Sequence, residues 1–247
     1  MSDLPHLLAR AWSDRATVSI PEALVPADSD AAYAAQTGLL GAIEDHAGGW
    51  KLGSRSADGP IQGAPLPARG IYGGGAVLKC NDFPVLGLEL EIAFCFGSAF
   101  HAADSAMSDD EIMACVQSMR TSIEIVASRV AGWPQVPQLV QLADLQNHGA
   151  LVVGEPIDYA ETFSFTNPTV HFSIGGKSLF EGQGSNPAGD PRRLLPWIVR
   201  HCLARQLPLP VGSILTTGTY VGAHFSAGPG LVKGEIDGLP ALLFTLE

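Results

Sequence analysis

Residues 85–96 read VLGLELEIAFCF, a run of strand-forming residues in which two acids stand at alternate positions. Successive side chains of a strand point to opposite faces, so Glu89 and Glu91 project from the same face. Two carboxylates about 7 Å apart in an apolar run would repel each other and lose hydration. A cation between them would remove both costs. Alternatively, both glutamates lie on the wet face of an edge strand, and the pattern leaves the two interpretations open.

A third acid stands in a second apolar run, SIEIV at residues 122–126. Glu124 follows Glu91 at a distance along the chain that suffices for a helix and a return strand. Three carboxylates leave coordination positions open for water and substrate oxygens, which suits a hard cation such as Mg²⁺ or Mn²⁺. Glu89, Glu91 and Glu124 are therefore candidate ligands of a metal ion, and the pattern alone leaves the edge-strand interpretation equally open.

Lysine is scarce in this chain, and Lys51 stands in WKLG at the start of the glycine-rich residues 48–75. Such a segment is a candidate wall or lid of an active site, built of loops and short strands. A lysine there could bind an anionic substrate or stabilise an enolate, although a lysine before a glycine is also common on surfaces.

Three short polar segments are weaker candidates. Asp144 precedes the polar residues 146–148, which could be only a turn. Ser185 ends the turn-like GQGS at 182–185, and Thr217 and Gly218 stand in TTGT at 216–219. Hydroxyl and backbone donors in such turns can bind a carboxylate, but ordinary turns have the same composition.

The composition excludes several classes of protein. The 247 residues carry 14 basic and 25 acidic side chains, a net charge of −11, with a mean hydropathy of +0.19. This acidity disfavours nucleic acid and anionic membranes, and the hydropathy disfavours disorder. Four scattered cysteines without a C-x-x-C pair indicate reduced thiols, and neither a signal peptide nor a membrane span is apparent. We expect a cytoplasmic globular protein.

The periodicity predicts an α+β fold. Helices are expected at residues 3–15, 29–46, 108–119 and 194–206, with Ser29 able to cap the second. Strands are expected at 85–96 and 121–127, and within 164–180 and 231–246. Gly175-Gly176 and Asp237-Gly238 are hairpin signals within these last two regions. Short strands with a few helices, without regular β-α-β alternation, are typical of this class.

Taken in order, these segments resemble the fumarylacetoacetate hydrolase superfamily, from about Trp50 to the C-terminus. Within it, they resemble the hydratase/decarboxylase branch, which contains 2-keto-4-pentenoate hydratase and 4-oxalocrotonate decarboxylase. The resemblance rests on WKLG at 50–53, ELEIAF at 89–94, IEIV at 123–126 with Ser128-Arg129, Ala143-Asp144 ahead of VVG at 152–154, GSI at 212–214 before Thr217-Gly218, and KGEIDGL at 233–239.

The resemblance implies a β-roll catalytic core, at residues 71–247, after an N-terminal helical portion with the glycine-rich segment, at residues 1–70. It implies Mg²⁺ or Mn²⁺ on Glu89, Glu91 and Glu124, with Lys51 as the active-site lysine and Asp144 as a pocket acid. The chain departs from the family pattern at Ala127, where an aspartate is usual, and at Leu145, where an asparagine is usual. Both departures could weaken catalysis or shift the substrate.

The expected function is that of a metal-dependent hydro-lyase of aromatic catabolism. It would add water to an unsaturated 2-oxo or 2-hydroxydienoic acid, as 2-keto-4-pentenoate hydratase does. Lys51 and Asp144 are the expected catalytic residues, with Asp144 or a metal-bound water moving the proton, and Thr217, Gly218 and Ser185 are expected to bind the substrate. A 4-oxalocrotonate-type decarboxylase or an inactive partner subunit is the alternative. An acylpyruvate hydrolase is disfavoured because residues 53–81 lack the histidine and glutamate that activate water in such enzymes. The partners expected are a small 2-oxo acid and further copies of the chain in a homo-oligomer, with neither nucleic acid nor membrane.

Overall fold

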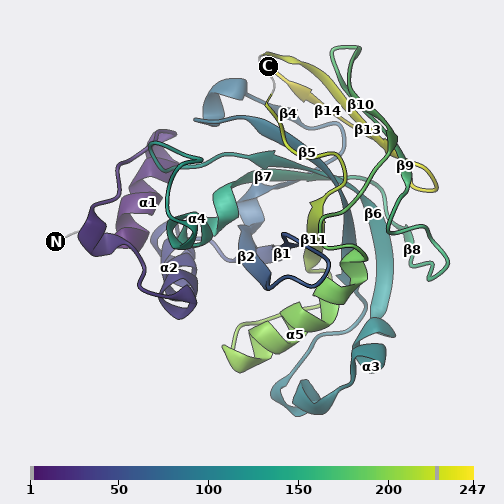
Figure 1. Cartoon of the computed structure of the whole chain (residues 1–247), viewed down its shortest axis with the longest axis horizontal. Coiled ribbons are helices and arrows are strands. Elements are labelled where there is room, and N and C mark those ends of the chain that lie inside the picture. The colour runs from purple at the N-terminus through teal and green to yellow at the C-terminus, as the bar shows by residue number, and fades with distance from the viewer. Residues whose placement is uncertain (1–2, 226–227) are drawn as a thin grey trace.

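The computed structural model describes residues 3–225 and 228–247 and has the predicted α+β architecture, with two sheets and few helices (Figure 1). The α-helices are α1 Leu4–Asp14, α2 Ser29–Ala42, α3 Asp109–Met113, α4 Gln138–Ala143 and α5 Leu194–Ala204. The strands are β1 Ala47–Ser54, β2 Ile61–Pro67, β3 Ile71–Gly73, β4 Val77–Leu78, β5 Gly87–Phe96, β6 Val116–Val126, β7 His148–Val153, β8 Ile157–Asp158, β9 Thr169–Ile174, β10 Lys177–Gln183, β11 Ile214–Thr219, β12 His224–Phe225, β13 Gly230–Ile236 and β14 Leu242–Leu246.

The strand that carries the paired glutamates lies inside a nine-stranded mixed sheet. Its order is β2-β1-β11-β5-β6-β7-β3, with β12 also beside β5 and β8 beside β6. In the antiparallel ladder between β5 and β6, Glu89 lies opposite Glu124 and Glu91 opposite Ser122. Because β5 has neighbouring strands on both sides, the edge-strand interpretation of Glu89 and Glu91 is wrong.

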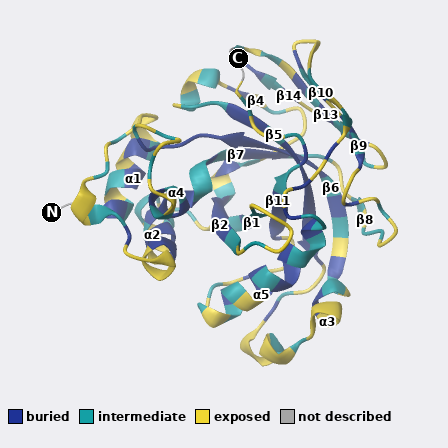
Figure 2. Cartoon of the chain, in the orientation of Figure 1, coloured by how far each residue is buried: buried dark blue, intermediate teal, exposed yellow. Residues whose placement is uncertain are grey.

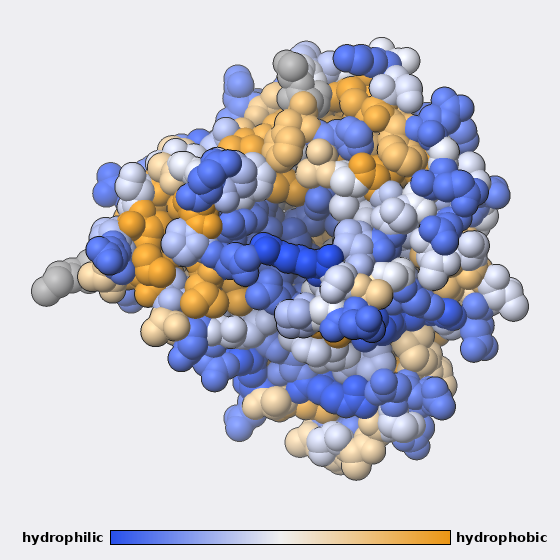
Figure 3. Space-filling model, in the orientation of Figure 1, coloured by the Kyte–Doolittle hydropathy of each residue, from blue (hydrophilic) through white to orange (hydrophobic). Residues whose placement is uncertain are grey.

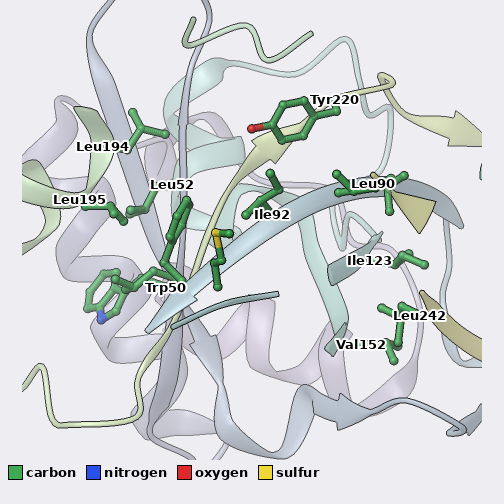
Figure 4. Packing of buried hydrophobic residues seen from close by; sticks show 14 of the residues in the cluster. Trp50, Leu52, Leu90, Ile92, Ile123, Val152, Leu194, Leu195, Tyr220 and Leu242 are labelled. Carbon is green, nitrogen blue, oxygen red and sulfur yellow. The ribbon is translucent and has the colours of Figure 1, made fainter. Parts of the chain in front are cut away.

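The other face of β5 and β6 packs against a five-stranded sheet of order β10-β9-β13-β14-β4. Leu90 and Ile123 meet Leu242 of β14 in this main core (Figure 4). The two sheets come closest at Gly234 of β13, where an added Cβ would lie 2.6 Å from Leu90 Cδ1. Glycine at this position therefore permits the close packing of the two layers.

Helices α1, α2 and α4 form a group at one side of the sheets (Figure 1) and share a separate apolar cluster that includes Leu8, Leu39 and Leu142. The first two confirm the predicted helices at 3–15 and 29–46. The side chain of Asp28, rather than Ser29, caps α2 by accepting from the Ala31 amide.

Helix α5 confirms the prediction at 194–206 and covers β1. Its Leu194 and Leu195 belong to the same core cluster as Trp50 and Leu52 of β1 (Figure 4). Strands β1 and β2 thus form part of the packed sheet, as the prediction of short strands in the glycine-rich segment anticipated. The predicted division at residue 70 falls inside this sheet.

The predicted helix at 108–119 is too long. Ser108 and Glu111 do form a capping box, but α3 ends at Met113 and β6 begins at Val116. Strand β6 pairs with β5 from Gly87 to Phe96. The hydrogen bonds of this ladder override the local helical pattern of residues 116–119. In Figure 2, α3 is mostly exposed while the middle of the sheet is buried.

The hairpins predicted at the two glycine turns are present, β9–β10 around Gly175-Gly176 and β13–β14 after Asp237-Gly238. All four cysteines are free thiols. Among the described residues, no helix is both long and apolar enough to cross a bilayer.

Candidate metal and substrate site

The three predicted acids meet at one place on the nine-stranded sheet. One carboxylate oxygen from each of Glu89, Glu91 and Glu124 lies within 4.8 Å of the others. Alternation along β5 places the first two on one face, and the β5–β6 register places the third opposite Glu89. Glu91 and Glu124 are 1% and 0% exposed and Glu89 is half-buried, so the group is not a solvated acidic surface.

Lys51 is brought to the same cluster from β1. Strand β1 pairs with β11, which in turn pairs with β5, so two ladders fix its position relative to the acids. Its Nζ donates to Glu124 Oε1 at 2.7 Å and to the carbonyl oxygen of Gln146 at 3.0 Å.

The protonation of the cluster follows from burial and mutual repulsion. Burial, followed by the charge of Glu124, raises the pKa of Glu89 to about 7 and that of Glu91 well above its usual range. Burial also opposes ionisation of Glu124, but Lys51 and His148 outweigh it and lower its pKa. Burial alone would lower the pKa of Lys51, yet the acids raise it, so Lys51 remains a cation.

These residues fit a divalent cation. Once all three carboxylates are ionised, the single positive charge of Lys51 leaves two negative charges for a cation to balance. In addition, Glu124 Oε2 is buried and has no hydrogen-bond partner among the described residues. An unpaired carboxylate oxygen beside two further acids is a costly arrangement without a cation and a normal one with it.

A cavity of about 390 Å³ opens directly onto the cluster. Lys51, Glu89 and Glu91 line it, and the β1–β2 connection forms one wall. The face seen in Figure 3 is hollowed near its centre, with hydrophilic residues below the hollow and hydrophobic residues above it. The volume suits a small organic acid.

Two of the three predicted substrate-binding residues line this cavity. Thr217 and Gly218 do so, but their donors are already engaged: the Thr217 hydroxyl donates to the Ile92 carbonyl and the Gly218 amide to Glu91 Oε2. Ser185 is exposed, and its amide donates to the Tyr220 carbonyl. It is not among the described residues that line the cavity.

Asp144 lies apart from the cavity lining of the described chain, in a buried ion pair with Arg129. Its Oδ2 accepts from the Arg129 amide at 2.9 Å and from the Ser128 hydroxyl at 3.1 Å. Burial raises its pKa, and Arg129 offsets only part of that effect. Arg129 also donates to the His148 carbonyl, so this acid anchors the segment that contacts Lys51 and Glu124.

Sequence reasoning did not identify Gln146, Asn186 and Arg55 as site residues. Gln146 contributes a backbone oxygen from a run of three left-handed residues, 145–147, that contains no glycine to signal it. Asn186 holds the turn by donating to the Thr217 and Gly218 carbonyls, and it follows a polar turn that looks ordinary in sequence. Arg55 lines the cavity from the β1–β2 connection.

The family model described as the fumarylacetoacetate (FAA) hydrolase C-terminal region matches residues 61–245. The chain belongs to this family. The match covers β2 to β14, and thus all three glutamates, while Lys51 stands just before it. No curated protein sequence matches the chain.

Solved structures of the same fold include several enzymes. The 4-oxalocrotonate decarboxylase of Pseudomonas putida G7, complexed with magnesium and adipate, is 16% identical, with a TM-score of 0.84 over 99% of this chain and 96% of that one. The 2-hydroxyhepta-2,4-diene-1,7-dioate isomerase of Mycobacterium marinum is 16% identical, with a TM-score of 0.58 over 82% and 75%. The fumarylacetoacetate hydrolase of Exiguobacterium antarcticum is 15% identical, with a TM-score of 0.59 over 81% and 74%.

The first of these covers nearly the whole chain, N-terminal helices included, whereas the other two cover about four fifths. At these identities the likeness establishes the fold. Decarboxylase, isomerase and hydrolase activities all occur on it.

Proposed function

We propose that this family member is a divalent-metal-dependent hydratase that adds water to an unsaturated 2-oxo acid. The observation that carries the proposal is the cluster of Glu89, Glu91 and Glu124 beside Lys51, with a buried and unpartnered oxygen on Glu124 among the described residues, at the wall of a small cavity. A Mg²⁺ or Mn²⁺ ion held there would supply Lewis-acid polarisation of the carboxylate and 2-oxo oxygens of the substrate.

Lys51 supplies the second electrophilic group. An ammonium has three donors, and two of them serve Glu124 and Gln146, so one is left for a substrate oxygen. Because Lys51 stays protonated, it stabilises the negative charge that grows on the 2-oxo oxygen as the unsaturated acid becomes an enolate. That enolate forms when water adds to the distal alkene carbon of the conjugated 2-oxo acid and loses a proton; protonation of the enolate at C3 then gives a 4-hydroxy-2-oxo acid.

Asn186 keeps the opposite wall in place. Through its two bonds to the 217–218 turn, it fixes the Gly218 amide that donates to Glu91 Oε2. We infer that Thr217 and Gly218 shape the cavity with their backbone, while substrate contacts come from Lys51 and the β1–β2 segment.

The test is an absorbance assay with 2-hydroxypenta-2,4-dienoate in Mg²⁺, in Mn²⁺ and in EDTA, with Glu91→Gln alongside. The hydratase proposal expects metal-dependent loss of the dienoate, 4-hydroxy-2-oxopentanoate as product, and no turnover by the variant. Tight metal binding without turnover of this acid would contradict the hydratase assignment and leave the metal site intact.

Arg55 favours a second candidate, a decarboxylase of a 2-oxo diacid. It lines the same cavity and is exposed; Gln138 in the same lining can accept from its guanidinium, which has further N–H donors for a second carboxylate. Arg69 and Arg129 line a different cavity. If the diacid is the substrate, Arg55→Gln should weaken turnover of 4-oxalocrotonate at least 10-fold and leave that of a monoacid unchanged. Equal effects on both would contradict a role in recognising a second carboxylate.

A further inference from the structure

His148, the first residue of β7, contacts Glu124 of the metal cluster, as Lys51 does, but has no role in the proposed mechanism. Its imidazole is 0% exposed, and its Nδ1 lies 2.9 Å from Glu124 Oε1. An ionised carboxylate oxygen can only accept a hydrogen bond, so Nδ1 carries a proton. Nε2 in turn is buried, with no partner in the part of the chain that the structure describes.

The two oxygens of Glu124 therefore have unequal surroundings. Oε1 accepts from both Lys51 Nζ and His148 Nδ1, at 2.7 and 2.9 Å, whereas Oε2 accepts from no described residue. Two donors on one oxygen fix the rotation of the carboxylate. The free oxygen is then the one available for a cation.

Residues 145–147, which precede His148, support the contacts of Lys51 and His148 to Glu124. Leu145, Gln146 and Asn147 have φ values of 50°, 52° and 62°, a left-handed run that non-glycine residues adopt at an energetic cost. That turn places the Gln146 carbonyl on Lys51 and delivers His148 to Glu124. Arg129 Nη1 donates to the His148 carbonyl at 2.6 Å and secures the backbone from the other side.

We propose that His148 is a positioning residue of the metal site: its Nδ1–H holds Glu124 Oε1 so that Oε2 faces the cation between Glu89 and Glu91. The inference rests on the proposed function, because it concerns the same cluster. It adds that the orientation of one ligand depends on an imidazole that touches neither the cation nor the substrate.

The test compares Mn²⁺ affinity by calorimetry in the full-length protein and in His148→Leu, His148→Asn and His201→Asn. Removing a group that orients a metal ligand typically costs 10- to 100-fold in affinity, and we expect that loss in His148→Leu. In His148→Asn the amide nitrogen takes the place of Nδ1, so the Kd should stay within about threefold of the wild type. His201 is a matched control, a partly buried histidine whose Nε2 also has no described partner, and which stacks on Trp197 away from the cavity lining.

Nitrogen-15 NMR of the histidine ring supplies a readout that does not depend on how well the leucine variant folds. We expect a proton on Nδ1 and a shift of that nitrogen when diamagnetic Mg²⁺ is added. An Nδ1 without a proton, or a wild-type Kd in folded His148→Leu, would overturn the proposal while leaving the metal site in place. Absence of Mn²⁺ binding by the wild type would overturn the proposed function and this inference together.

Discussion

At Glu91, a carboxyl group that is 1% exposed accepts a hydrogen bond from the Gly218 amide. Burial raises its pKa, so the folded protein binds its proton more tightly than the unfolded chain does. The ionised form therefore destabilises the metal-free protein, and the penalty grows as the pH rises. Ionised Glu91 therefore lowers the stability of the metal-free fold, and a bound cation would offset this cost.

Glu91→Gln should consequently stabilise the metal-free protein, by about 1–2 kcal/mol at pH 8, because the amide can still accept from Gly218 and carries no charge. The same change should abolish the increase in Tm that Mn²⁺ gives the wild type. Thermal melts with and without Mn²⁺ measure both effects, with the exposed Glu155→Gln as a control that should change neither. A lower Tm of metal-free Glu91→Gln would contradict the account.

Lys51→Met separates binding from chemistry. Removing one positive charge favours the cation, which offsets the loss of one of the two hydrogen bonds that orient Glu124, so Mn²⁺ affinity should stay within about tenfold of that of the wild type. Turnover should nevertheless fall by about 10²- to 10³-fold, the usual loss when a donor to a developing oxyanion is removed. Calorimetry and the dienoate assay on one preparation provide the comparison, and a parallel loss of both properties would show that Lys51 only supports the metal site.

At the scale of elements, the sequence predicts that Glu89 and Glu91 share one face of a strand. It does not predict the β5–β6 ladder that brings them to Glu124. Alternation within β5 predicts the side shared by Glu89 and Glu91. The register that sets Glu89 opposite Glu124 depends on pairing over the length of β5 and β6, which local pattern does not encode. The same ladder explains why the predicted helix at 108–119 gives way to a strand after Met113.

The parts of the site that sequence reasoning missed depend on loops. The left-handed residues 145–147 carry no glycine, so nothing in their composition announces the turn that supports Lys51. Asp144 stood beside this turn in the sequence, yet its carboxylate points to Arg129. Which way such a side chain faces is decided by tertiary packing.

Gly234 tests the packing between the two sheets. A Cβ at this position would lie 2.6 Å from Leu90 Cδ1 and 3.0 Å from Ile123 Cδ1, so Gly234→Ala should cost about 1–3 kcal/mol of unfolding free energy. The matched control is Gly41→Ala in α2, where no atom lies within 4 Å of the new Cβ. Helix propensity predicts a gain of about 0.5–1 kcal/mol there. Urea unfolding of both variants measures the difference, and equal effects would refute the proposed close packing.

At the scale of the whole molecule, His201 of α5 joins the N-terminal helices to the sheet. Its ring packs against Tyr33 of α2, Trp50 of β1 and Trp197 of α5. Burial, assisted by the charge of Arg205, lowers the pKa of His201 to about 4. Below about pH 6.5 the histidine is therefore protonated in the unfolded chain but not in the folded protein. The free energy of unfolding consequently decreases as the pH falls from 6.5 towards 4.

His201→Phe removes this titration and retains the aromatic packing. Because the ring is partly exposed, solvent screening reduces the linked loss in the wild type to roughly 1–2 kcal/mol between pH 7 and pH 4.5. The unfolding free energy of the wild type should fall by that amount relative to the variant over this range. Parallel pH profiles of the two proteins would show that His201 does not carry the linkage.

The homo-oligomer expected from composition and from the family resemblance stays a prediction. The residues that hold the candidate site, from Lys51 to Gly218, all lie within a single chain, so the site as described does not require a second copy. We therefore expect metal binding to follow the number of chains, whatever the size of the assembly.

The central claim is that three buried carboxylates of one chain hold one divalent cation. Equilibrium dialysis against Mn²⁺ at pH 8 tests it most directly, on the wild type and on Glu91→Gln and Glu124→Gln. The account predicts one Mn²⁺ per wild-type chain and a loss of binding of at least 100-fold in each variant. Binding that is absent from the wild type, or unchanged in both variants, would contradict it.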